Sequence, residues 1–389
     1  METCKTGQLC DINPKTTIYL EPDKQISFVP MNAVSVDGKI DTSKSIALDS
    51  ITNYTTFRNG DILFAKITPC MENGKGCIAD KLKNGYGAGS TEFIVLRPKR
   101  ELVTQKWLYL FLSQKSFRLH CQQHMTGSAG QKRVPPKFLA NCDIPCPSLL
   151  EQERIVSRIE ELFSQLDASV AELKTAKERL KVYRQAVLKE AFDQCKEFVP
   201  LSSLGDLGRG KSKHRPRNDP ALFEGGKYPF IQTGDVKAAS KYITNYSKMY
   251  GEFGLQQSKL WPKGTLCITI AANIAETAFL GIDACFPDSV VGFTPYDCIL
   301  PEFVRYFIES QKQRLWSFAP ATAQKNINLD TLEKLMIPYC SVDEQREIIY
   351  EIDSKITICD NIEQTIDTSL QQAEALRQSI LKKAFEGRF

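Results

Sequence analysis

The chain has 389 residues, of which 42% are hydrophobic and 25% are charged, and its formal net charge is +4 at pH 7. This length exceeds one ordinary hydrophobic core, so two or three domains are expected. No apolar run of about 18 residues occurs, which excludes a membrane-spanning helix. The first residues, METCKTGQLC, lack a basic and then apolar leader, so a cytoplasmic protein is expected.

The first 147 residues contain short apolar segments bounded by Gly, Pro and Asn, a pattern typical of β-strands. These segments are ISFVP (26–30), DILFAKI (61–67), GCIAD (76–80) and TEFIVLRP (91–98). The Asn-Gly pair in ENGKG (72–76) predicts a loop. One helix is expected near Gln105–Cys121, so this part of the chain is a mixed α/β domain.

Thirteen cysteines are present without any Cys-x-x-Cys pair, which favours reduced thiols over disulfides or a zinc cluster. In HCQQH, the side chains of His120, Cys121 and His124 could share one face of a helix. No second pair of ligands follows at zinc spacing, so a partly exposed helix end is the favoured interpretation. We predict no metal site.

A long helix is predicted over 148–193. From Ile155 onward, apolar or small residues recur in alternating steps of four and three residues, which is the heptad pattern of a coiled coil. Neither Pro nor Gly interrupts the stretch, which at about 40 residues would be about 60 Å long. The predicted contact stripe, or seam, contains Ile155, Ile159, Leu162, Leu166, Leu173, Leu180 and Val187, with Ser169, Ala176 and Tyr183 at the intervening positions of the same pattern.

The second half of the chain repeats the first at an offset of 193 residues. SLLEQERI at Ser148 returns as SVDEQREI at Ser341, AVLKEAF (186–192) returns as SILKKAF (379–385), and Gln131-Lys132 returns as Gln324-Lys325. The strand segments of the second copy are YPFIQ, GTLCITI, TAFLGI and SVVGFTP, and a helix is expected near Pro301–Phe318. The second seam contains Ile348, Ile352, Ile362, Ile366, Leu376 and Ile380.

These patterns predict an α+β protein with four segments. Two mixed α/β domains, 1–147 and 194–340, are each followed by a long helix, 148–193 and 341–389. Ser341 and Glu344 offer a capping box for the second helix. A lone helix with such an apolar stripe would leave large side chains in water, so each helix needs a partner. We expect the two helices to form an antiparallel coiled coil with pseudo-twofold symmetry.

Charge is distributed unevenly between these segments. The two long helices contain 14 of the 50 basic and 19 of the 46 acidic residues, which leaves 36 basic and 27 acidic residues elsewhere. An excess of positive charge on the mixed domains indicates nucleic acid as their partner. The densest basic stretch is GRGKSKHRPRN, although a solvated loop without a target would have the same composition.

Several of these motifs resemble the specificity subunit of type I restriction–modification systems. The similar stretches are PCPSLLEQERIVSRIEELFSQLDASVAELK, RQAVLKEAF, GDILFAKI and ILKKAFEGRF, and the resemblance includes the tandem order of domain and helix. It implies a non-catalytic subunit whose two target-recognition domains each bind one half of an asymmetric DNA site. It also implies that the helices set the gap between the half-sites.

The resemblance further implies the partners of such a subunit. Two modification subunits would form a DNA adenine methyltransferase with it, and restriction subunits would add an ATP-dependent translocating nuclease. S-adenosylmethionine, ATP and Mg²⁺ would then be bound by those partners, and this chain would bind no cofactor.

Two rival classes of protein fit these patterns less well. An enzyme would need motifs that are missing: the only Pro-Pro lies in VPPK, and no Gly-x-Gly-x-x-Gly occurs. Asp61, Glu72 and Lys75 come nearest to a metal nuclease, but their spacing is wrong. A coiled-coil adaptor that never binds DNA would explain the helices, but not the positive charge on the domains.

The expected DNA contacts come from glycine-rich and basic loops, which can follow phosphates. Loops that merely join a domain to its helix would have similar sequences. The predicted contacts are Lys66, Lys75, Lys132, Arg133, Arg209, Lys211, Lys213, Arg215, Arg217, Lys325 and Asn326.

Overall fold

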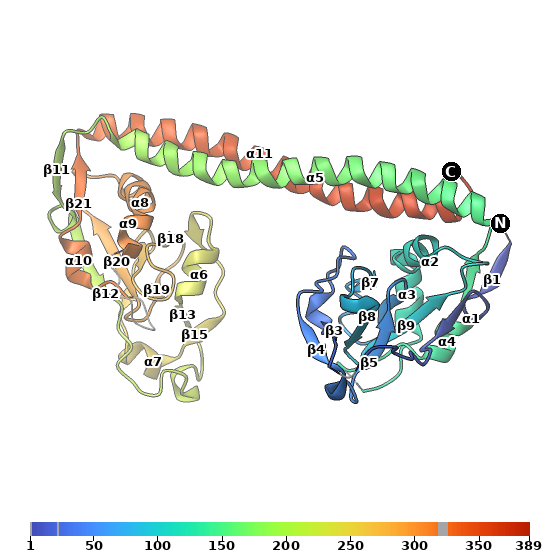
Figure 1. The fold of residues 1–389 in the computed structure, drawn as a ribbon. Helices are drawn as coiled ribbons and strands as arrows, with labels where there is room; N and C mark the ends of the chain where they lie inside the picture. The colour runs from blue at the N-terminus through green and yellow to red at the C-terminus, as the bar shows by residue number, and fades with distance from the viewer. Residues whose placement is uncertain (1, 22, 129, 318–325) are drawn as a thin grey trace. The chain divides into compact units, whose positions relative to one another are not determined.

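The computed structural model describes residues 2–21, 23–128, 130–317 and 326–389. The chain divides into two compact units (Figure 1). The first contains the residues up to Leu173 together with Asp367–Phe389, and the second contains Lys174–Ile366. Each unit therefore combines one mixed domain with part of both long helices, α5 (Leu149–Phe192) and α11 (Val342–Phe385).

The first unit contains an antiparallel four-stranded sheet, a mixed four-stranded sheet and a two-stranded ribbon. One sheet has the order β2 (Cys10–Ile12), β9 (Phe93–Pro98), β6 (Ile62–Ala65), β7 (Gly76–Ile78). The other has the order β4 (Ser45–Ala47), β3 (Gln25–Val29), β8 (Tyr86–Gly89), β5 (Thr55–Arg58), and β3 and β8 are parallel. The ribbon joins β1 (Thr3–Lys5) to β10 (Asp143–Pro145).

Four helices accompany these strands: α1 (Thr6–Leu9), α2 (Gln105–Leu112), α3 (Lys115–Gln123) and α4 (Pro136–Ala140). The single helix predicted near Gln105–Cys121 is therefore wrong, because the chain breaks between α2 and α3. Gln114 has extended backbone angles at the break, and the Ser113 hydroxyl donates to the Tyr109 carbonyl oxygen at 2.8 Å. Gln114 is the N-cap residue of α3, and a helix does not continue through a residue with these angles.

The second unit repeats this plan with one additional strand in its larger sheet. A five-stranded sheet has the order β12 (Gly205–Arg209), β20 (Val290–Pro295), β17 (Leu266–Thr269), β18 (Thr277–Leu280), β14 (Tyr242–Ile243). A four-stranded sheet has the order β15 (Lys248–Tyr250), β13 (Tyr228–Phe230), β19 (Ala284–Cys285), β16 (Leu260–Trp261). A ribbon joins β11 (Glu197–Pro200) to β21 (Met336–Tyr339). All eight strand segments expected from the sequence are confirmed.

The helices of the second unit are α6 (Thr233–Ala238), α7 (Glu252–Gln256), α8 (Pro301–Ser310), α9 (Lys312–Ser317) and α10 (Leu329–Glu333). The helix predicted near Pro301–Phe318 is likewise divided into α8 and α9, and Phe318 lies outside the described residues. Short 3-10 helices occupy Met31–Ala33, Leu48–Ser50, Lys83–Gly85, Leu201–Ser203 and Pro220–Leu222.

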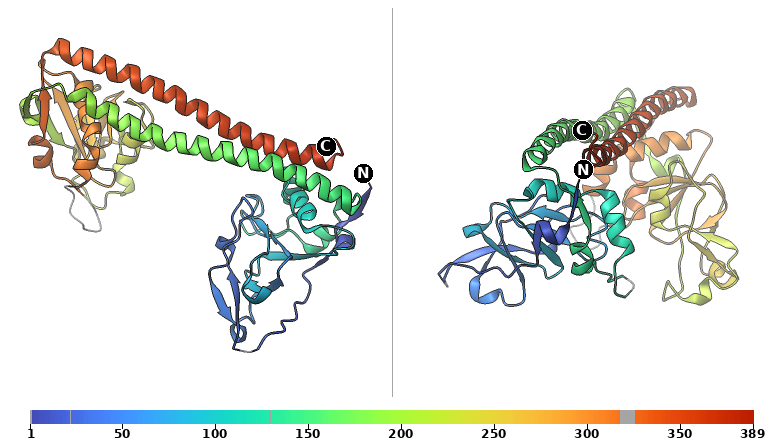
Figure 2. Two further views of the ribbon diagram at one scale, coloured as in Figure 1. Left: turned by 45° about the horizontal axis from the view of Figure 1, so that its top comes forward. Right: turned by 90° about the vertical axis from the view of Figure 1, so that its right-hand side faces the viewer.

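Helices α5 and α11 lie side by side and run antiparallel within each unit (Figures 1 and 2). In the first unit, Asp167 pairs with Arg377, and the Arg154 side chain reaches the Phe389 carbonyl oxygen at 3.4 Å. In the second unit, Arg184 pairs with both Asp360 and Glu363. The predicted capping box is confirmed, because Ser341 N–H donates to Glu344 Oε2 at 2.8 Å.

The seam predicted for α11 is partly wrong. Ile352, Ile366 and Ile380 are buried, but Ile362 and Leu376 are 45% and 52% exposed. The next residues along the helix, Glu363 and Arg377, are less exposed and form ion pairs with α5. At these two positions of α11, the contact with α5 is therefore made by the residue that follows the predicted one. Long side chains with charged tips can cover such an interface as effectively as Ile or Leu.

The large aliphatic residues of the predicted α5 seam are buried or half-buried, whereas Ser169, Ala176 and Tyr183 at the intervening positions are exposed. Ile155, Ile159, Leu180 and Val187 are buried. Partial burial is found for Leu162, Leu166, Leu173 and, on α11, Ile348. The part of the chain that the structure describes contains no helix long and apolar enough to cross a membrane.

Candidate nucleic-acid interface

A loop between α3 and α4 carries the basic residues predicted to contact DNA in the first unit. Arg133 pairs through its backbone with Thr126 and Ile67, and Val134 N–H donates to the Lys66 carbonyl oxygen at 2.9 Å. The Thr68 hydroxyl donates to the Gly130 carbonyl oxygen at 3.1 Å. These bonds fasten the loop to the end of β6, so its side chains are held by a sheet rather than by a flexible tether.

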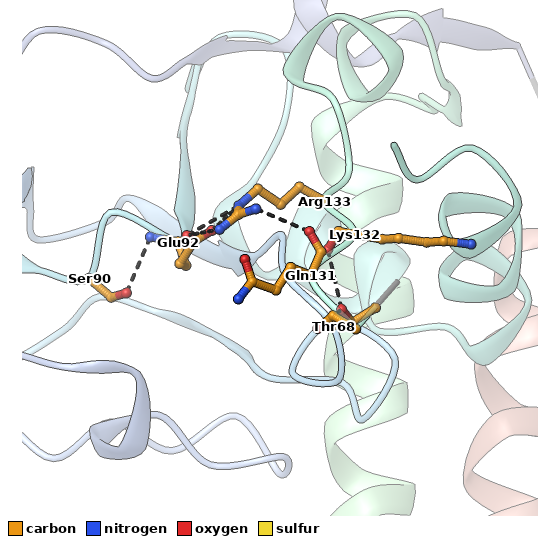
Figure 3. Close-up of polar contacts among 7 residues, drawn as sticks. Thr68, Ser90, Glu92, Gln131, Lys132 and Arg133 are labelled. Atoms are coloured by element: carbon orange, nitrogen blue, oxygen red, sulfur yellow. Dashed lines mark hydrogen bonds and ion pairs between the residues drawn. The ribbon is translucent and has the colours of Figure 1, made fainter. Parts of the chain in front are cut away.

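The Arg133 side chain has an intramolecular partner, Glu92, at the start of β9 (Figure 3). Nε and Nη2 of Arg133 donate to the Glu92 carboxylate at 2.9 and 2.8 Å, and Nη1 donates to the Gln131 carbonyl oxygen at 3.1 Å. The hydrogen bonds from Arg133 lower the pKa of the Glu92 carboxyl. Because the pair is charge-assisted and two-pronged, its geometry is well defined.

Lys132, in contrast, is exposed and extends away from the Arg133–Glu92 pair (Figure 3). Its ammonium forms no ion pair with any described residue. Lys66 is half-buried beside the same loop, and its positive charge also acts on Glu92. The structure does not bring the Lys75 side chain to this group, because its ammonium donates to the Met31 carbonyl oxygen at 3.0 Å.

The second unit builds the same backbone frame from different residues. Asn326 bridges to Ala271, and Ile327 N–H donates to the Ile270 carbonyl oxygen at 2.9 Å, as Val134 does to Lys66. Ile270 N–H donates to the Ser289 carbonyl oxygen at 3.0 Å, as Lys66 N–H does to that of Glu92 at 2.9 Å. Asn326 and Ser289 thus stand where the first unit has Arg133 and Glu92.

The basic stretch 209–217 lies partly on this frame. Arg209 Nε donates to the Asp288 backbone oxygen at 2.9 Å, and Arg217 Nη2 contacts both carboxylate oxygens of Asp288 at 2.8 and 2.7 Å. Arg209, Arg217, Asp288, Trp316 and Asn326 line an open cavity of about 640 Å³. Charged groups and one aromatic ring therefore face a recess large enough to admit part of a ligand.

The remaining predicted residues of this stretch do not line that cavity. Arg215 turns back onto its own loop, where Nη1 donates to the His214 carbonyl oxygen at 2.9 Å. Lys211 and Lys213 are exposed, and their backbones are tied to Ser258 and Gln257. Lys325 lies outside the described residues.

Sequence reasoning missed the acidic partners, Glu92 and Asp288, and the aromatic Trp316. Glu92 lies near the start of one predicted strand segment and Asp288 directly precedes another, but nothing in a single sequence indicates which arginine each would bind. The pairing depends on the fold, which brings Glu92 within reach of a residue 41 positions away.

The acidic residues considered for a metal nuclease each bind a different side chain. The Asp61 carboxylate binds the Arg97 guanidinium at 2.7 and 2.8 Å, and Glu72 accepts a hydrogen bond from Gln122 at 2.9 Å. Within the described ranges, no group of three or more His, Cys, Asp or Glu side chains is placed to hold a metal ion. In HCQQH, the His124 ring stacks on Phe138 at 4.3 Å, which is an ordinary packing contact.

Fold and loops together define a protein of two tandem recognition units carried on paired helices. The pattern of the type I restriction modification DNA specificity domain matches residues 1–178 and again residues 196–372. Because these matches cover most of the chain, the protein belongs to that family.

Individual relatives agree with this assignment. The chain is 44% identical over 164 residues to the type I restriction enzyme EcoAI specificity subunit of Escherichia coli, covering 41% of this chain and 27% of that protein. It is 26% identical over 292 residues to the EcoBI specificity subunit of Escherichia coli, covering 67% and 61%. The match therefore spans only about a quarter of the first of these relatives.

Solved structures share the fold. A chain from work on complex assembly and conformational transition of the type I R-M system has a TM-score of 0.82 at 20% identity, covering 100% of this chain and 98% of that one. The HsdS subunit from Thermoanaerobacter tengcongensis has a TM-score of 0.58 at 20% identity, covering 100% and 97%.

Proposed function

We propose that this chain supplies the DNA sequence specificity of a type I restriction–modification complex in the cytoplasm. Each mixed domain would bind one half of a bipartite, asymmetric site, and the long helices would set the gap between the halves. The observation that carries the proposal is the repeated loop frame with unlike side chains. Arg133 and Glu92 in one unit and Asn326 and Ser289 in the other present different donors and acceptors to DNA.

The chain would have no catalytic activity of its own. Two modification subunits would bind it and carry out adenine methylation with S-adenosylmethionine. Restriction subunits would bring ATP and Mg²⁺. Exposed cations such as Lys132 support DNA as the partner of the domains, because phosphate contacts dominate the affinity of such proteins.

Methylome sequencing tests the proposal directly. The chain is co-expressed with a cognate modification subunit, in a host that lacks other adenine methylation. We expect one methylated motif with two unlike half-sequences and a fixed gap. A symmetric motif, or no methylation by a soluble complex, would contradict the proposal.

A coiled-coil adaptor without affinity for DNA is the alternative. Fluorescence anisotropy with the purified complex separates the two functions. DNA specificity requires binding to duplex DNA that weakens steeply as salt is raised, whereas an adaptor would show no binding at low salt.

A further inference from the structure

Gln152, in the first turn of α5, is a fully buried polar residue whose side chain makes three hydrogen bonds. Its Oε1 accepts from Thr104 N–H at 2.9 Å, and Thr104 is the N-cap residue of α2. Its Nε2 donates to the carbonyl oxygens of Leu102 and Pro147 at 3.0 and 2.9 Å. One amide thus joins the start of α5 to the start of a helix in the recognition domain.

Gln345, in the first turn of α11, makes the corresponding bonds in the second unit and is also fully buried. Its Oε1 accepts from Leu300 N–H at 2.8 Å, and Leu300 is the N-cap residue of α8. Its Nε2 donates to the carbonyl oxygens of Cys298 and Cys340 at 3.1 and 2.9 Å. We call each of these three-bond arrangements an amide clamp.

An aromatic contact attaches each recognition domain to the other long helix. Phe385, near the end of α11, packs on Trp107 of α2 with ring centroids 4.4 Å apart. Phe192, at the end of α5, packs on Phe303 and Phe307 of α8 at 5.2 and 5.3 Å. Helices α2 and α8 are therefore each held by an amide from one long helix and by an aromatic ring from the other.

The amide and the aromatic attachment differ in how strictly they fix the orientation of the domain on the helix. Apolar contacts are non-directional and tolerate small rotations or slips, because the burial is almost unchanged. A buried amide is satisfied in one orientation only, since any displacement leaves donors and acceptors unpaired in a low-dielectric surrounding. A single buried amide can fix the register of paired helices for the same reason.

We propose that Gln152 and Gln345 are positioning residues that fix the orientation of each recognition domain on the long helices, and thereby restrict the protein to one half-site gap. This inference rests on the proposed function. It adds that the gap depends on two amide clamps as well as on helix length, and that base recognition itself does not involve them.

The test replaces Gln152 by Met and, separately, Gln345 by Met in the complete methyltransferase complex. Met keeps the length and volume of Gln but removes the hydrogen bonds. Each variant complex methylates a library in which the native half-sequences are separated by the native gap or by one base pair more or less. Matched controls are Gln185→Met and Gln371→Met, which make the same change at exposed positions of the same two helices.

We expect methylation at off-gap sites, relative to native-gap sites, to rise roughly five- to tenfold in either clamp variant, and to stay unchanged in the controls. The half-sequences should not change. A purely stabilising role would reduce methylation at all sites and leave this ratio constant, which would overturn the proposal. Insolubility of both clamp variants would also overturn it, because the amides would then maintain the fold rather than the gap.

The experiment separates this inference from the proposed function. Failure of the wild-type complex to methylate a bipartite motif would contradict the function itself. A wild-type complex with one gap and clamp variants with the same single gap would contradict only the role of the amides.

Discussion

Nε and Nη2 of Arg133 bind the Glu92 carboxylate at 2.9 and 2.8 Å, and this pair divides the basic loop of the first unit into two kinds of cation. The positive charge of Arg133 is largely compensated by its partner. The neighbouring charge of Lys132 is exposed and has no such compensation among the described residues. Adjacent residues of one loop should therefore contribute differently to DNA binding.

Replacing Lys132 by Ala should weaken binding to specific and unrelated duplexes by similar factors. A lysine that contacts phosphate releases about one counterion, so the plot of log K against log salt should flatten by about 0.9. Fluorescence anisotropy at several salt concentrations measures this slope. Lys189→Ala, at an exposed position of α5, is the control and should leave the slope unchanged. An unaltered slope for Lys132→Ala would exclude a phosphate contact.

Replacing Glu92 by Gln should have the opposite effect on unspecific binding. The substitution removes the carboxylate that compensates Arg133 and leaves the guanidinium free to contact phosphate. Affinity for unrelated duplexes should rise, and the salt dependence should steepen by up to about 0.9. The ratio of specific to unspecific affinity should fall. If the double variant Glu92→Gln/Arg133→Ala showed the same steepening, Arg133 would not be its source.

The same pair predicts a dependence of stability on pH. Hydrogen bonds from Arg133 lower the pKa of Glu92 in the folded protein, so the unfolded chain binds more protons in the acid range. The contribution of the pair is complete above the pKa of an unfolded glutamate, about 4.3, and is lost as the pH falls through the lower folded pKa. Thermal unfolding should therefore show wild type more stable than Glu92→Gln at neutral pH, with a difference that shrinks below about pH 4. A constant difference would contradict this.

Much of the fold was predictable because local patterns determined it. The eight strand segments, the Asn-Gly loop and the two long helices depend on nearby residues and on the repeat. The breaks between α2 and α3 and between α8 and α9 were missed, because neither Pro nor Gly marks them. The Ser113 hydroxyl that bonds back to Tyr109 is equally compatible with an unbroken helix.

Two wrongly predicted positions of the α11 seam show a different limit of prediction from sequence. Residue type favoured Ile362 and Leu376, whereas the interface contains Glu363 and Arg377. The reason is the set of side chains that α5 presents. Lys177 and Arg184 of α5 pair with Glu363. Phe163 of α5 has the Arg377 guanidinium 4.2 Å above its ring. Periodicity within one helix cannot show which charges the partner helix presents.

Two alanine substitutions on α11 test the corrected seam. Ile352→Ala should lower the free energy of unfolding by about 2–5 kcal/mol, because it opens a cavity in a closed core. Ile362→Ala makes the same change at a side chain that is 45% exposed, and should cost less than about 1 kcal/mol. Chemical denaturation of the complex compares the two. Equal losses of unfolding free energy in the two variants would mean that Ile362 contributes to the seam after all.

The candidate contacts were less predictable than the fold. Lys132 and Arg133 were found from composition and from their place in the repeat. The sequence could not show that Arg133 is bound to Glu92 or that Lys75 donates to Met31. Glycine-rich and basic loops predict an interface, but the charge that each side chain could offer to DNA depends on its tertiary partners.

A four-residue insertion after Leu173 of α5 tests whether helix length sets the gap between half-sites. Four residues lengthen a helix by about 6 Å and rotate the residues beyond the insertion by roughly 40°. The predicted seam is weakest near Ser169–Leu173, where Ser169 is exposed and Leu173 only half-buried, so few apolar layers are disturbed there. Since B-DNA rises about 3.4 Å per base pair, the methylated motif should keep both half-sequences and gain one or two base pairs in its gap. Methylome sequencing decides the outcome: changed half-sequences with an unchanged gap would mean that the domains, and not the helices, determine the spacing.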